Sequence, residues 1–105
     1  MPGTALSVGI VLCAATLTAG FAVVAGGAIV GQRLAGAADA SALAAADAAS
    51  GAIDGVPCDR AAQVASASGA ELTACELDGL VATVTVSLPF AALSAQASAR
   101  AGPPE

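Results

Sequence analysis

The sequence contains no lysine, histidine, tryptophan or tyrosine, and its only cations are Arg33, Arg60 and Arg100. Histidine, lysine and tyrosine are common catalytic bases, and without them the serines have no evident activating partner. Three arginines against eight acidic residues give a net charge of −5, so no basic patch is expected for nucleic acid. We therefore expect a protein that is not an enzyme and does not bind nucleic acid.

Patterns that bind metals are missing as well. Without histidine, Cys58 and Cys75 cannot complete a usual zinc site, and their spacing is not that of a redox Cys-x-x-Cys motif. The acids Asp54, Asp59 and Asp78 lack the alternating spacing of a calcium loop. We expect no metal, no cofactor and no small-molecule substrate.

Charge is absent from residues 4–31, which form a long run of apolar and small side chains. A helix rises about 1.5 Å per residue and the bilayer core is about 30 Å thick, so about twenty such residues span it. Residues 1–32 are therefore predicted to cross the lipid bilayer of the cell membrane once. A cleaved signal peptide is the alternative, because residues 25–28 are small, but the apolar part of a signal peptide is about 7–15 residues long and follows positive charge.

Gly27, Gly31 and Ala35 recur every four residues near the end of this run. Such spacing of small residues lets two membrane helices approach closely, so these three are predicted helix-packing residues. A chain rich in alanine and glycine also produces this spacing by chance, and that alternative stays open.

Proline is absent between Gly3 and Val56, so the helix is expected to continue as a stalk over residues 33–50. At 100° per residue this stalk is amphipathic, and Asp39 and Asp47 are expected to be solvated. The polar side carries Gln32, Asp39, Leu43, Asp47 and Ser50, and the opposite side carries Leu34, Ala37, Ala38, Ala45 and Ala48.

A small folded domain is predicted over residues 51–101. Turn residues in 51–57 reverse the chain, and residues 58–68 have the spacing of a short helix that presents Cys58 and Ala65 on one side. Asp78-Gly79, between two runs rich in β-formers, predicts a hairpin of residues 71–77 and 80–88.

The expected hairpin register pairs Leu77 with Leu80 and places Cys75 opposite Ala82, on the face toward the core. Residues 94–101 alternate alanine with polar residues, which predicts a third strand, although alanine favours a helix there. Residues 102–105 are expected to be a disordered tail.

Cys58 and Cys75 are predicted to form a structural disulfide, with two buried free thiols as the alternative. Closing a loop of about seventeen residues stabilises a fold by about 3 kcal/mol in the chain-entropy model. A disulfide indicates an oxidising compartment, so we expect the C-terminal domain outside the cytoplasm, although Arg33 after the membrane run favours the opposite orientation. Cys13 is interpreted as a small apolar residue of the membrane run.

Several motifs along nearly the whole chain resemble a known family. They are Gly3-Thr4-Ala5 leading into the membrane run, Arg33 followed by residues 38–46, the Cys58 and Cys75 pair, Asp78-Gly79 with the Val-Thr-Val strand, and residues 99–103. In this order they resemble the small actinobacterial TadE-like proteins of a helicase and secretion gene neighbourhood. That resemblance implies a pilin-like component of a Flp (tight adherence) pilus or a type II/IV secretion apparatus, with other membrane subunits as partners. Val8 stands where pilin-type processing sites often carry Glu, so we do not expect prepilin-peptidase processing at Gly3.

The sequence thus predicts an α+β, pilin-like protein with a long N-terminal transmembrane helix, a short second helix and a small antiparallel sheet. We expect a structural role in an envelope assembly. The alternatives are a surface-anchored binding module unrelated to pili and a secreted domain released by signal cleavage.

Overall fold

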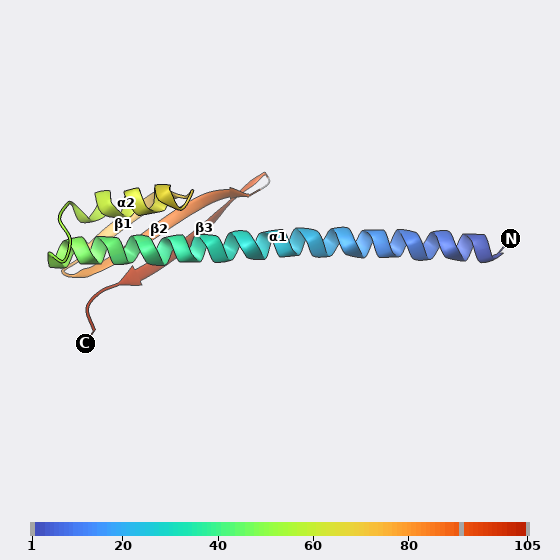
Figure 1. The fold of residues 1–105 in the computed structure, drawn as a ribbon, viewed down its shortest axis with the longest axis horizontal. Coiled ribbons are helices and arrows are strands. Elements are labelled where there is room, and N and C mark those ends of the chain that lie inside the picture. The colour runs from blue at the N-terminus through green and yellow to red at the C-terminus, as the bar shows by residue number, and fades with distance from the viewer. Residues whose placement is uncertain (1, 91, 105) are drawn as a thin grey trace.

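The computed structural model describes residues 2–90 and 92–104. Two helices, α1 (Pro2–Ser50) and α2 (Pro57–Ala67), precede three strands, β1 (Glu71–Asp78), β2 (Val81–Phe90) and β3 (Leu93–Ala101). Figure 1 shows α1 running along the whole molecule, with α2 and the sheet gathered beside its C-terminal half. The predicted α+β layout with a long N-terminal helix is confirmed.

Helix α1 is one continuous element of 49 residues, and the molecule is accordingly 76 Å long but only 28 by 17 Å across. It ends where Gly51 adopts a left-handed φ of 82°. The Gly51 amide donates to the Ala48 carbonyl, and the Ala52 amide donates to the Asp47 carbonyl at 2.9 Å. These bonds satisfy carbonyls that the end of a helix leaves free, and glycine adopts the required φ without strain.

The C-terminal part of α1 packs against the sheet and α2 through the side that the sequence predicts. Its buried residues are Leu34, Ala37, Ala38, Ser41, Ala42, Ala45 and Ala46. Asp39, Leu43 and Asp47 are exposed on the other side. Because the buried side consists mostly of methyl groups, α1 lies close to its neighbours and the core is thin.

Helix α2 begins at Pro57, one residue before the predicted start, and buries Ala61 and Ala65. Proline suits the first helical turn because its missing amide donor would have no partner there. A disulfide joins Cys58 on α2 to Cys75 on β1, with the two Cα atoms 5.9 Å apart. The predicted cysteine pair is therefore confirmed, and it fastens α2 to the first strand.

The sheet is antiparallel with strand order β1-β2-β3, so the predicted third strand is confirmed and the helical alternative is wrong. Val84 and Val86 on the central strand face Ala99 and Ala97 on β3. The valines are fully buried and the alanines partly so. Burial of this alternating face beneath α1 outweighs the preference of alanine for a helix.

The predicted hairpin register is wrong by two residues. Leu77 lies opposite Ala82 rather than Leu80, and Cys75 lies opposite Val84 rather than Ala82. Gly79, with a φ of 63°, is the first of the two turn residues rather than the second. A shift of two residues keeps every side chain on its face, so the placement of Cys75 toward the core is still right.

Two further features of the strands differ from the prediction. A bulge interrupts the pairing between Leu72 and Ala74, and Thr73 there donates its hydroxyl to the Thr85 carbonyl at 3.2 Å. Strand β2 continues beyond Leu88 through Pro89. Along β2, pairing with β1 extends only to Ser87, so at Pro89 the central strand has β3 as its one neighbour. The missing amide donor of proline is tolerated there.

Ser41 is the one fully buried side chain oxygen without a hydrogen-bond partner in the described part of the chain. A buried hydroxyl that makes no hydrogen bond costs about 1–3 kcal/mol. We expect Ser41→Ala to raise the free energy of unfolding by about 1 kcal/mol, measured by hydrogen exchange of the strand amides. Ser66→Ala, at an exposed position of α2, is the control and should gain less. Destabilisation by Ser41→Ala would contradict this account of the core.

Candidate membrane and assembly surface

Within the part of the chain that the structure describes, no element packs against the N-terminal half of α1. Residues 3–25 are all exposed, including large apolar side chains such as Leu12, Leu17 and Phe21. By length and composition α1 is able to cross a membrane, and none of its most apolar window is buried. Twenty-three helical residues extend for about 34 Å, close to the thickness of a bilayer core. This half of α1 is the candidate membrane-spanning surface.

Three hydroxyl side chains on this surface are satisfied within the helix. Ser7 donates to the Gly3 carbonyl, Thr16 to the Leu12 carbonyl and Thr18 to the Ala14 carbonyl, at 2.8–2.9 Å. In hydrocarbon, a polar group without a hydrogen-bond partner costs about several kcal/mol of free energy. The three hydroxyls are therefore compatible with an apolar environment around the helix.

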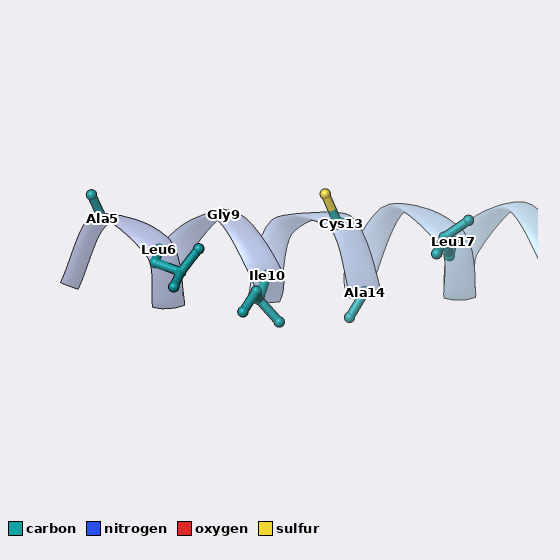
Figure 2. Close-up of a pocket in the computed structure, with 7 residues that line it drawn as sticks. All are labelled: Ala5, Leu6, Gly9, Ile10, Cys13, Ala14 and Leu17. Carbon is teal, nitrogen blue, oxygen red and sulfur yellow. The ribbon is translucent and has the colours of Figure 1, made fainter. Parts of the chain in front are cut away.

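The depressions on this surface are not enclosed cavities. Figure 2 shows one of them, and all of the side chains that line it come from a single helix. They are Ala5, Leu6, Gly9, Ile10, Cys13, Ala14 and Leu17. Small residues at Ala5, Gly9 and Cys13 lie between larger neighbours, which makes a shallow relief. Such relief suits lipid chains or a second helix rather than an enclosed small molecule.

The three predicted helix-packing residues have different surroundings. Gly27 is half-buried, and a Cβ atom there would lie 3.8 Å from the ring of Phe90 on β2. Gly31 and Ala35 are exposed, and a Cβ atom at Gly31 would meet nothing within 4 Å. Gly27 thus contacts the sheet of its own chain, whereas Gly31 and Ala35 leave room for another helix.

The remaining candidate residues lie away from one another. Cys13 is a free, exposed thiol on the apolar half of α1, far along the chain from the disulfide. Among residues 2–90 and 92–104, no three cysteine or acidic side chains gather as a metal-binding group. Arg60 is engaged near its own helix, where it donates to the Asp54 carbonyl at 2.7 Å and to the Gln63 side chain at 3.2 Å.

The end of the sheet formed by Phe90 and Leu93 was not predicted from the sequence. These two residues pair across the β2–β3 turn, and Leu93 is 75% exposed. A signal was present, because no charged residue occurs from Val81 to Ala99 and Phe90 is one of only two aromatic residues. The position of this turn beside α1 follows from the tertiary structure alone.

Fold and surface together define a class: an α+β protein of pilin-like layout, in which a long apolar helix continues into a small domain stapled by a disulfide. No family model matches the chain, and no curated protein or solved structure is significantly similar to it. Any functional conclusion therefore depends on the helix, the disulfide and the surfaces described above.

Proposed function

We propose that this chain is a non-enzymatic, membrane-anchored, pilin-like component of a Flp pilus or a type II/IV secretion apparatus, of the TadE-like kind. The observation that carries the proposal is the single helix α1, whose exposed apolar half continues without a break into the half that packs on the sheet. A rigid connection of this kind suits a subunit that holds a folded domain at a fixed distance from a membrane or filament axis.

The orientation that we propose places the folded domain outside the cytoplasm, with α1 crossing the cell membrane once. The disulfide between Cys58 and Cys75 supports this orientation, because disulfides persist in oxidising compartments. Arg33 is a single positive charge close to Asp39, so it is a weak signal for the opposite orientation.

The partners that we propose are other membrane subunits of the assembly, which pack on the exposed side of α1. Gly31 and Ala35 are open on that side, and small residues allow close approach between membrane helices. The exposed apolar relief toward the N-terminus would extend the same contact.

Co-purification from native membranes tests the proposal. The tagged full chain, extracted in mild detergent, should retain membrane subunits of a pilus or secretion system. Gly31→Leu should reduce their recovery, because the larger side chain fills the space that the partner helix needs. Gly36→Leu is the matched control: it adds the same side chain about 140° around the helix, at an exposed position whose Cβ would also meet nothing within 4 Å. Recovery of a monomer that captures a ligand by itself would instead favour a surface-anchored binding module.

A further inference from the structure

The end of the sheet at the β2–β3 turn lies beside the membrane-spanning run of α1. The ring of Phe90 would be 3.8 Å from a Cβ atom on Gly27, which fixes the level of this end along the helix. In Figure 1 the β2–β3 end of the sheet points along α1 toward its N-terminal half, while the β1–β2 turn lies near the C-terminal end of α1. The two ends of the sheet therefore lie at very different distances from the apolar run.

The chemistry of the two ends also differs. The turn between β1 and β2 carries the acid Asp78, whereas no charged residue occurs from Val81 to Ala99. At the β2–β3 end, Phe90 is partly buried against α1 and Leu93 is 75% exposed. A leucine that is so exposed, beside an aromatic ring and within a segment without charge, is suited to contact with an apolar phase. The exposed acid Glu71 lies on β1 opposite Ser87, three residues before Phe90 along β2.

The position of Arg33, the first charged residue after the apolar run of α1, indicates how deep this end of the sheet lies in the membrane. Gly27 precedes Arg33 by six residues, which is about 9 Å along the helix axis. The polar layer of a bilayer is about 5–7 Å thick on each side, from the difference between its full and its hydrocarbon thickness. With Arg33 at the outer edge of that layer, Gly27 and the Phe90 ring reach the boundary between headgroups and hydrocarbon.

The same apolar surface continues from the sheet onto α1. Phe21, Val24 and Ile29 lie on either side of the Gly27 level along the helix, and they are 62–73% exposed. A bilayer around α1 would therefore meet Leu93 at the level at which it meets these side chains. A lipid interface is the occupant that this continuity favours.

We infer that the β2–β3 turn is a second membrane contact, in which Leu93 inserts at the headgroup boundary while Phe90 packs on α1. The inference rests on the proposed anchoring of the chain by α1. Two points of contact, the helix and the turn, would fix the tilt of the sheet relative to the membrane, which one helix alone leaves free. The face of the domain that is presented to other subunits would be set in this way.

Fluorescence of a single introduced tryptophan tests the inference without background emission, because the chain has no tryptophan of its own. The full chain carrying Leu93→Trp is reconstituted in phosphatidylcholine vesicles, with lipids brominated at shallow or deep positions of the acyl chain as quenchers. Leu80→Trp, at the other end of the sheet, and Leu17→Trp, within the apolar run, are the matched controls; both leucines are exposed. Protection of the strand amides from hydrogen exchange in each variant shows that the domain is folded.

We expect shallow bromolipids to quench Leu93→Trp more strongly than deep ones and to leave Leu80→Trp unquenched, while deep bromolipids quench Leu17→Trp. Quenched Leu17→Trp with unquenched Leu93→Trp would overturn the second contact and leave the anchor intact. Shielding of Leu93→Trp from aqueous iodide without lipid quenching would also overturn it, because protein would then cover this residue. Unquenched Leu17→Trp would overturn the anchor, and the inference with it.

Discussion

Replacement of both Cys58 and Cys75 by serine is expected to lower the free energy of unfolding of the folded domain by about 3 kcal/mol. The disulfide closes a loop of 17 residues and joins α2 to β1 across a core built largely from alanine. Hydrogen exchange of the strand amides measures this change in the full chain in detergent or nanodiscs, and protection should fall about a hundredfold, since 1.4 kcal/mol is a factor of ten.

The control for the disulfide is Cys13→Ser. Cys13 is free and exposed on the apolar half of α1, so its replacement should leave the protection of the strands unchanged. If the double serine variant retained nearly all of its protection, the sheet and helices would be stable without the disulfide, and the account of the thin core would be wrong.

The second large effect is expected at Leu34, whose replacement by alanine should cost about 3 kcal/mol, within the range for buried leucines. Leu34 is 2% exposed and is among the largest fully buried side chains, in contact with the cluster around Val86. Its neighbours on α1 are mostly alanines, and they have little side chain with which to fill the cavity.

Leu43→Ala is the matched control, because Leu43 lies on the same helix but is 56% exposed. Surface substitutions of this kind usually change stability by less than about 0.5 kcal/mol. Equal effects of the two substitutions on strand protection would mean that α1 does not pack on the sheet through the side that carries Leu34.

The long helix and the hairpin were predictable because their signals are local. Residues 4–31 have no charge, and no proline occurs between Gly3 and Val56, so the sequence contains nothing to end α1 before Gly51. Asp78-Gly79 marks the turn between β1 and β2. Cysteine spacing and the alternation of the two flanking runs were sufficient to place Cys75 on the core side.

The details that the sequence did not predict depend on how strands meet. An Asp-Gly pair fits a turn with glycine second, but here Gly79 is first, and the register moves by two residues. Neither the bulge near Thr73 nor the continuation of β2 past Pro89 has a clear local signal. The bulge depends on the register between β1 and β2, and the continuation of β2 depends on where its pairing with β1 ends.

The surface toward the membrane was only partly predictable, for the same reason. Spacing alone grouped Gly27 with Gly31 and Ala35 as helix-packing residues. In the folded chain Gly27 lies against Phe90, a contact between residues 63 positions apart that no periodicity along α1 reveals. The expected tail at residues 102–104 has no helix or strand and is exposed, while Met1 and Glu105 lie outside the described residues.

The central claim is that α1 anchors the chain and holds a disulfide-stapled domain outside the cytoplasm. Labelling of intact cells with a membrane-impermeant maleimide, before and after reduction, tests it most directly when followed by intact-mass analysis of the membrane fraction. We expect Cys58 and Cys75 to be labelled only after reduction, on a chain whose mass includes residues 4–31. Thiols that are free and labelled only after the membrane is permeabilised, or a mature chain that begins after residue 28, would contradict the claim.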